Sequence, residues 1–129
     1  MSIDLKEAQV AYQDRYSDHL ELFRRIRKDF AAKNNAGVAV TLGQYGSYYM
    51  PRSSKKEVNV PAFADRVIDA VGAGDAFFSL TTLLAKVDCP DNMLLFLGNV
   101  FAGLKTKIMG NKSSISRSQL LKAVTAILK

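Results

Sequence analysis

The first third of the chain carries apolar residues at helical spacing. This pattern predicts a short helix over residues 4–12 with Asp4 as its N-cap, and a second helix over about residues 18–33 capped by Ser17. An apolar stripe marks the buried face of the second helix and consists of Leu22, Phe23, Ile26 and Phe30.

The middle of the chain has the pattern of short strands separated by turns. Asn35 or Gly37 is expected to end the preceding helix in a left-handed conformation. The β-branched run Val-Ala-Val-Thr-Leu, residues 38–42, predicts a buried strand. A second strand is expected in Ser-Tyr-Tyr-Met, and a third in Val-Asn-Val-Pro-Ala-Phe, ending at Pro61 after the polar turn Pro-Arg-Ser-Ser-Lys-Lys-Glu.

The last part returns to helical spacing. Helices are expected to begin near Ala73, at Asp91 as an N-cap, and at residue 117. Their expected buried faces are Ala76, Phe77, Leu80, Leu84 and Val87, then Leu97, Val100, Phe101, Leu104 and Ile108, then Leu120, Leu121, Val124 and Leu128. The order of two helices, three strands and three helices indicates part of a layered α/β protein, with a sheet that is small for its helices.

Composition allows one domain with a core, since 48% of the 129 residues are hydrophobic. The chain has no apolar run near the roughly 18 residues of a membrane span and no signal-peptide pattern at its start, so we expect a cytoplasmic protein without membrane contact. A single cysteine, Cys89, excludes an internal disulfide and a cysteine metal cluster.

The net charge of +6 raises the question of nucleic-acid binding. The basic residues are scattered, however, and are not interleaved with aromatic residues. This distribution favours solvated faces with a general attraction for phosphates over a dedicated nucleic-acid interface.

The sequence Asp-Ala-Val-Gly-Ala-Gly-Asp, which begins at Asp69, carries the clearest candidate chemistry. Gly72, Ala73 and Gly74 stand where a helix begins, so their backbone amides form a candidate anion cradle. Asp75 would stand in the first helical turn beside the anion, and Asp69 would hold the amides of the loop or a cation. No Gly-Lys-Ser/Thr sequence follows, so the loop is not of the Walker type.

Two interpretations of this loop remain open at this point. In a phosphoryl-transfer site the cradle would stabilise the transferred group, and Asp75 would accept the proton of the attacking hydroxyl. In the other interpretation the loop is a glycine-rich turn followed by an ordinary first-turn acid.

The stretch Asp-Ala-Val-Gly-Ala-Gly-Asp-Ala-Phe-Phe resembles the second signature of the ribokinase-like carbohydrate kinases, the PfkB family, whose usual form is Asp-Thr-x-Gly-Ala-Gly-Asp before an apolar helix. Ala70 stands where the signature has Thr. A second stretch, Val-Thr-Leu-Gly-Gln-Tyr-Gly, is similar to the Thr-x-Gly-x-x-Gly nucleotide loop of the family, with Thr41, Gly43 and Gly46 at the matching positions.

Two weaker matches add to this resemblance. Asp-Leu-Lys-Glu aligns with the Asn-x-x-Glu motif that handles magnesium and phosphates, which places Glu7 near Mg²⁺ and Asp4 at the position of the Asn. The alternative for these two residues is a helix cap with a surface Glu. The stretch Phe-Leu-Gly-Asn-Val-Phe-Ala-Gly resembles the helix on the adenine side of the pocket, with Asn99 and Gly103 as candidates.

The resemblance implies the C-terminal portion of a ribokinase-like three-layer α/β/α fold over residues 1–129, with the N-terminal substrate-binding half absent. It implies transfer of a phosphoryl group from ATP to a sugar or sugar phosphate, with Mg²⁺ and a monovalent cation, the candidate metal residues being Glu7 and Asp69. We expect the 129 residues alone to be inactive and to self-associate through an exposed sheet edge. The alternative function is a non-catalytic nucleotide- or anion-binding module or regulatory subunit.

Overall fold

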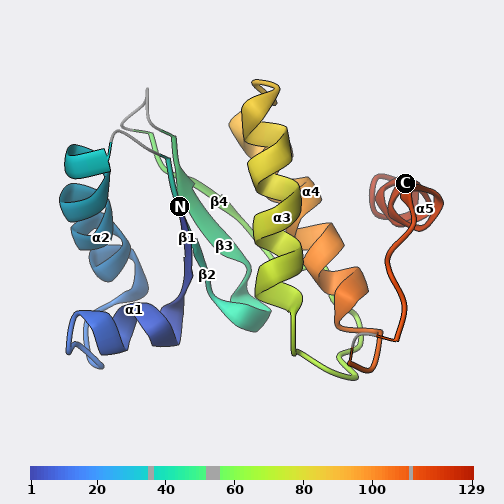
Figure 1. Ribbon diagram of the computed structural model, residues 1–129, viewed down its shortest axis with the longest axis horizontal. Helices are drawn as coiled ribbons and strands as arrows, with labels where there is room; N and C mark the ends of the chain where they lie inside the picture. Colours follow the sequence, from blue (N-terminus) through green and yellow to red (C-terminus); the bar gives the residue numbers. More distant parts are fainter. Residues whose placement is uncertain (35–36, 52–55, 111) are drawn as a thin grey trace.

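The computed structural model describes residues 1–34, 37–51, 56–110 and 112–129, and there the chain forms one four-stranded sheet between two layers of helices (Figure 1). In chain order the elements are β1 (Ser2–Asp4), α1 (Leu5–Ala11), α2 (His19–Asn34), β2 (Val38–Thr41), the 3₁₀ turn η1 (Gly43–Tyr45), β3 (Ser47–Met50), β4 (Val58–Val60), α3 (Ala73–Lys86), α4 (Asp91–Lys105) and α5 (Arg117–Ile127). Asn35 and most of the predicted turn at 51–57 lie outside the described residues.

The strands follow the order β1-β2-β3-β4 across the sheet. β1 runs parallel to β2, whereas β2 with β3 and β3 with β4 are antiparallel. Asp4 pairs with Thr41, so the carboxyl ends of β1 and β2 lie side by side at one edge of the sheet. The sequence pattern does not predict β1, because three residues followed directly by a helix are too few to show alternation.

The two faces of the sheet each bury their own core. On one face α1 and α2 cover a cluster that includes Phe23, Ile26 and Val40. On the other face α3 and α4 cover a smaller cluster in which Phe77 and Leu95 are fully buried (Figure 1). Burying one such side chain contributes about 1.5–3 kcal/mol to stability. The two helical layers and the sheet between them form the expected three-layer arrangement.

Several predicted helix faces differ from the observed ones. Exposed side chains stand at predicted core positions, with exposed fractions of 40% for Phe30, 72% for Val87, 53% for Leu121 and 72% for Leu128. In α5, all of whose residues the structure describes, no residue is buried. The reason is that α5 packs against α4 and not against the sheet, so its apolar stripe has no second surface to cover it (Figure 1).

The helix starts confirm one predicted cap and correct two. Asp4 caps α1 as expected. Asp18 takes the place predicted for Ser17, because its Oδ2 accepts a hydrogen bond from the Leu20 amide at 2.9 Å, while Ser17 donates its hydroxyl to Asp14 at 2.6 Å. Asp91 lies in the first turn of α4, which begins after Pro90 without a side-chain cap. None of the helices in the described ranges combines the length and apolar character that a membrane span requires.

The turn between α1 and α2 gives the fold a sensitivity to acid. The Asp14 carboxylate accepts hydrogen bonds from the hydroxyl and amide of Ser17 and the amide of Tyr16, and it pairs with Arg25. These contacts, the Ser17 hydroxyl foremost, lower the pKa of Asp14 from 3.8 to about 2. Because the pKa of Asp14 is lower in the folded state, the carboxylate stabilises the fold fully above the pKa of the unfolded chain. This stabilisation is lost as the pH falls through the pKa of the folded state.

We therefore expect the free energy of unfolding to decrease between about pH 4 and pH 2. In the Asp14→Asn variant this decrease should be smaller, because the group that binds the extra proton in the unfolded chain is gone. Urea unfolding followed by circular dichroism across this pH range measures both. Identical pH profiles for the two proteins would contradict the role given to Asp14.

Candidate active site

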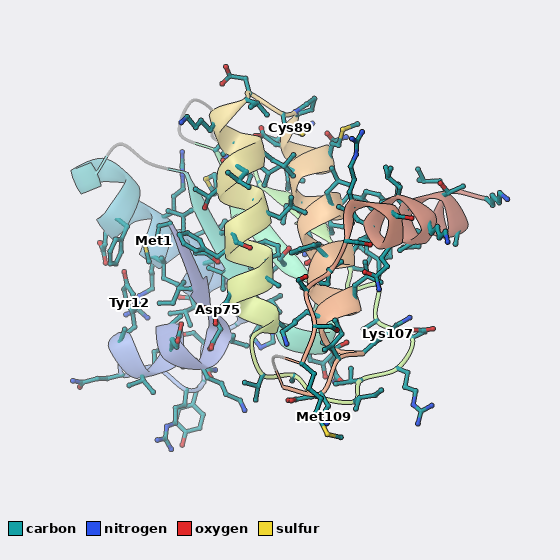
Figure 2. The ribbon with its side chains drawn as sticks, turned by 45° about the vertical axis from the view of Figure 1, so that its right-hand side comes forward. Met1, Tyr12, Asp75, Cys89, Lys107 and Met109 are labelled. Carbon is teal, nitrogen blue, oxygen red and sulfur yellow. The ribbon has the colours of Figure 1, made fainter. Side chains whose placement is uncertain are left out.

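Three segments with candidate chemistry meet at the edge of the sheet where β1 and β2 end. The start of α1 follows β1 directly, the turn at 43–46 follows β2, and the N-terminal part of α3 lies beside β1. Figure 2 shows Asp75 at the end of α3 that lies nearest this edge. Ligands of open α/β sheets bind outside the carboxyl ends of the parallel strands, so this edge is the candidate site.

The glycine loop at the start of α3 has the geometry of an anion site. Gly72 has a φ of 79° as the N-cap residue, a left-handed conformation that favours glycine. The carbonyl of Gly72 accepts the Ala76 amide at 3.0 Å, and the Ala73 amide donates to the Ala70 carbonyl at 3.2 Å. The next amides along the chain are those of Gly74 and Asp75. They belong to the first turn, whose N–H groups have no hydrogen-bond partner within an α-helix.

The space in front of this turn is open. A Cβ built on Gly74 would have no atom within 4 Å apart from its own helix backbone and chain neighbours. The side chain of Asp75 is exposed in the same turn. The loop can therefore receive an anion at the positive end of α3 with a carboxylate next to it.

Asp69 holds the loop in place. Its Oδ1 accepts the Val71 amide at 2.9 Å, and its Oδ2 accepts the Gly110 amide at 2.7 Å. The backbone hydrogen bonds from Val71 and Gly110 lower the pKa of Asp69. Of the two roles predicted for Asp69, the structure shows the holding of loop amides, and the role as a metal ligand stays a prediction.

The turn after β2 is tight and is built on two glycines. Gly43 and Gly46 have φ values of 58° and 93°. The Gly46 amide donates to the Gly43 carbonyl at 3.2 Å, and the Leu42 amide donates to the Gly46 carbonyl at 2.8 Å. Thr41 lies at the end of β2 and pairs with Asp4 on one side and Ser47 on the other. These backbone groups are thus fixed at the candidate edge.

Asp4 and Glu7 form a capping box at the start of α1. The Asp4 carboxylate accepts the Glu7 amide at 2.9 Å, and the Glu7 carboxylate accepts the Asp4 amide at 3.1 Å. Within the described residues no group of three or more metal-binding side chains occurs. An exposed pair of carboxylates fits Mg²⁺ nonetheless, since this ion is usually held by one or two carboxylates together with water and substrate phosphates.

Asn99 and Gly103 are placed inside the protein. Asn99 is 6% exposed, its amide nitrogen donates to the carbonyls of Val60 and Pro61 at 3.0 and 3.2 Å, and its Oδ1 accepts the Ser47 hydroxyl at 3.1 Å. A Cβ on Gly103 would lie 3.4 Å from the backbone of Phe63 and Ala64. Both residues tie α4 to the sheet or to the segment after it, and the nucleotide contacts predicted for them stay predictions.

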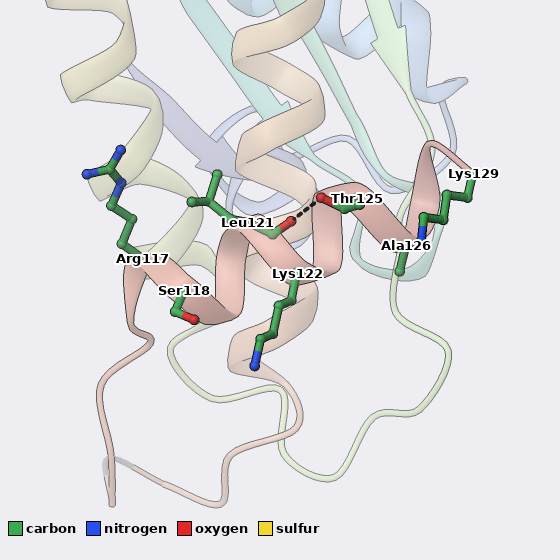
Figure 3. A pocket seen from close by; sticks show the side chains of 7 residues that line it. All are labelled: Arg117, Ser118, Leu121, Lys122, Thr125, Ala126 and Lys129. Atoms are coloured by element: carbon green, nitrogen blue, oxygen red, sulfur yellow. Dashed lines mark hydrogen bonds between the residues drawn. The ribbon is translucent and has the colours of Figure 1, made fainter.

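A cavity of about 380 Å³ lies next to the glycine loop, and no sequence motif predicted it. It is lined by Ala76, Phe101, Lys105, Ser113, Ser114 and Ile115. Phe101 and Lys105 are four residues apart and therefore lie on one face of α4. This spacing is the feature of the sequence that could have indicated the cavity. A larger hollow of about 870 Å³ lies along α5 and is lined by residues of this helix and by Lys129, none of them from the glycine loop (Figure 3).

Comparison with known sequences identifies a family. A profile of pfkB family carbohydrate kinases matches residues 8–116. The deoxyribokinases of Salmonella typhi and Salmonella typhimurium are each 32% identical to the chain over 92 residues, which make up 71% of this chain and 26% of the relative. The chain therefore spans about a quarter of the length of these curated relatives.

Solved structures share the fold over nearly the whole chain. A probable sugar kinase of Rhizobium etli is 25% identical with a TM-score of 0.78, covering 99% of this chain and 36% of that one. Phosphofructokinase-2 of Escherichia coli, in complex with potassium, is 18% identical with a TM-score of 0.79, and the match covers 99% of this chain and 40% of that one. Ribokinase of Thermotoga maritima is 19% identical with a TM-score of 0.78, and the match covers 96% of this chain and 41% of that one. These likenesses confirm the predicted ribokinase-like α/β fold.

Proposed function

The chain belongs to the pfkB family of carbohydrate kinases, and we propose that it forms the nucleotide-binding and catalytic part of an enzyme that transfers a phosphoryl group from ATP to a sugar hydroxyl. The observation that carries the proposal is the exposed Asp75 in the first turn of α3, directly after the open glycine loop. We place these 129 residues in the C-terminal part of the enzyme, because the order of the motifs matches that part of the family.

Asp75 acts as the general base in this proposal. The hydroxyl of the acceptor attacks the terminal phosphorus of ATP, the bond from that phosphorus to the bridging oxygen of ADP breaks, and the hydroxyl proton passes to the Asp75 carboxylate. The amides of the loop, Gly72 to Gly74 with that of Asp75, stabilise the charge on the transferred group. The Ala73 amide contributes once it exchanges its bond to the Ala70 carbonyl for one to the phosphate.

The nucleotide lies across two of the described features. The turn that includes Gly43 and Gly46 borders the phosphates, with Thr41 at its start. The cavity beside Ala76 accepts the nucleoside, since Phe101 and Ile115 supply apolar surface there. Mg²⁺, when bound, neutralises phosphate charge, and the exposed carboxylate of Glu7 with that of Asp4 would hold its water shell.

The acceptor is a sugar or sugar phosphate. The deoxyribokinases, the ribokinase and the phosphofructokinase among the similar proteins support this class by their names. The part of the fold that holds the acceptor lies outside these residues in the proposal, because the similar structures are more than twice as long as the region they share with this chain. The 129 residues alone are therefore inactive in this proposal, and the open β1 edge remains the candidate surface for self-association.

The Gly74→Ala substitution tests the anion cradle without disturbing the fold. Gly74 is helical, and its Cβ would meet no neighbouring atom within 4 Å, so Ala should leave stability unchanged or raise it by up to about 1 kcal/mol. A helical Cβ points toward the helix N-terminus, where the phosphate is proposed to bind. We therefore expect kcat/KM for ATP to fall by roughly tenfold or more in the enzyme that carries these residues.

Steady-state kinetics and thermal unfolding of the same preparation measure the two effects. Ser79→Ala, farther along the exposed side of α3, is the matched control. If Gly74→Ala retains full kcat/KM at unchanged stability, the loop does not approach the phosphates and the proposed site is wrong.

A further inference from the structure

Lys105 is a buried cation next to the glycine loop that the proposed reaction does not use. The residue is 9% exposed at the end of α4 and lines the cavity next to Ala76. Its ammonium group donates a hydrogen bond to the carbonyl of Gly110. A buried ammonium group is retained only with compensating partners, so this contact indicates a specific task.

The same turn also holds the carboxylate that fixes the loop. Gly110 donates its amide to Asp69 at 2.7 Å while its carbonyl accepts from Lys105. The positive charge of Lys105 is close enough to contribute to the low pKa of Asp69, after the hydrogen bonds from Val71 and Gly110. Lys105, Gly110 and Asp69 therefore form a connected unit of ammonium, peptide and carboxylate.

A second connection joins the start of the glycine loop to the end of α4. The Thr106 carbonyl accepts the amides of Ile68 and Asp69 at 2.8 and 3.0 Å. Four oxygen atoms that face this region, the two of Asp69 and the carbonyls of Thr106 and Gly110, each accept a hydrogen bond from nitrogen. Among the residues that the structure describes, each of these oxygens thus accepts at least one N–H group.

This arrangement does not fit the monovalent cation expected near Asp69. The Lys105 ammonium group, bound to the Gly110 carbonyl, already brings a positive charge to these oxygens and would repel a second cation at this place. We propose that the Lys105 ammonium group takes the place of a monovalent metal cation and fixes the glycine loop to the end of α4. The order of the loop is therefore independent of potassium and sodium, and this holds whether or not the chain takes part in phosphoryl transfer.

The test compares the stability of the wild type and of Lys105→Met in chloride salts of potassium, sodium and tetramethylammonium at equal ionic strength. Wild-type Tm should agree within about 1 °C in the three salts. Met keeps the length and apolar stem of Lys but removes the charge, so Lys105→Met should lower Tm by roughly 5–10 °C in tetramethylammonium. Potassium should restore part of this loss with saturation, because the vacated position then accepts a cation.

Lys107→Met is the matched control, since Lys107 is exposed on the same turn and pairs with the exposed Asp65 at 2.7 Å. It should change Tm little and show no specific response to potassium. A loss of stability in Lys105→Met no larger than in Lys107→Met would overturn the proposal.

A second measurement does not depend on the folding of any variant. Potassium titrated into the wild type against constant chloride should leave the amide NMR signals of Val71 and Gly110 in place. Saturable shifts of these signals, or a saturable rise of wild-type Tm with potassium but not with tetramethylammonium, would show a bound metal cation and overturn the proposal.

Discussion

Replacing Asp75 by Asn is expected to lower kcat by roughly 10²–10⁴-fold and to change ATP affinity by no more than about threefold. Asn has the size of Asp but cannot accept the hydroxyl proton. The glycine amides that we propose to bind phosphate are backbone groups, which the substitution leaves in place. The measurement uses the protein that carries these residues together with its sugar-binding part. Kinetics give kcat, and calorimetry gives the dissociation constant of ATP.

Asp88→Asn is the matched control for this variant. Asp88 follows the other end of α3 with a φ of 53°, a conformation that Asn tolerates well, and it is exposed like Asp75. The control removes the same charge from the turn after the far end of α3, so its kcat should stay at the wild-type value. Full turnover in Asp75→Asn would exclude Asp75 as the base. ATP binding without turnover in the wild type would favour the non-catalytic module.

Replacing Gly46 by Ala is expected to destabilise the fold by roughly 3 kcal/mol or more. Gly46 has a φ of 93°, and a Cβ there would overlap the Val60 carbonyl oxygen and lie 2.7 Å from backbone atoms of Pro61. Both obstacles are backbone atoms, so no side chain can rotate away to make room. The end of β4 would have to move, and with it the carbonyls of Val60 and Pro61 that bind Asn99.

Gly43→Ala separates backbone conformation from steric overlap. Gly43 has a φ of 58°, yet a Cβ there would have nothing within 4 Å. The Gly43→Ala substitution should lower the free energy of unfolding only by the cost of the left-handed conformation, about 1–2 kcal/mol. Chemical unfolding of both variants measures the difference. Equal losses would mean that the contact with β4 contributes nothing to the effect.

The elements with strong local signals could be predicted from the sequence. The start of α3 near Ala73, the N-cap role of Asp4, and the burial of Phe23 and Phe77 all follow from capping and apolar periodicity. The glycine loop was found for the same reason, because anion binding at a helix start depends on residues that are adjacent in sequence.

Features that depend on distant contacts were missed. β1 is defined by its pairing with β2, 37 residues away. The apolar stripe of α5 predicted burial, but burial requires a neighbour on every side, and among the described elements α4 is the one that α5 mainly packs against. The connection between Asp69 and Gly110 joins residues 41 positions apart, and no local pattern marks Gly110 as the partner of Asp69.

That connection also determines how the site can move. The hydrogen bonds from residues 68 and 69 to Thr106 and from Gly110 to Asp69 clasp the α3–α4 hairpin at its base. A helical pair closed in this way opens as one cooperative unit, so its amides should exchange with solvent together and not helix by helix. The glycine loop that begins at Asp69 is part of the clasp. Departures of the loop from this geometry should therefore be coupled to the opening of the whole hairpin, which would make the loop a rigid receptor for the anion that we propose.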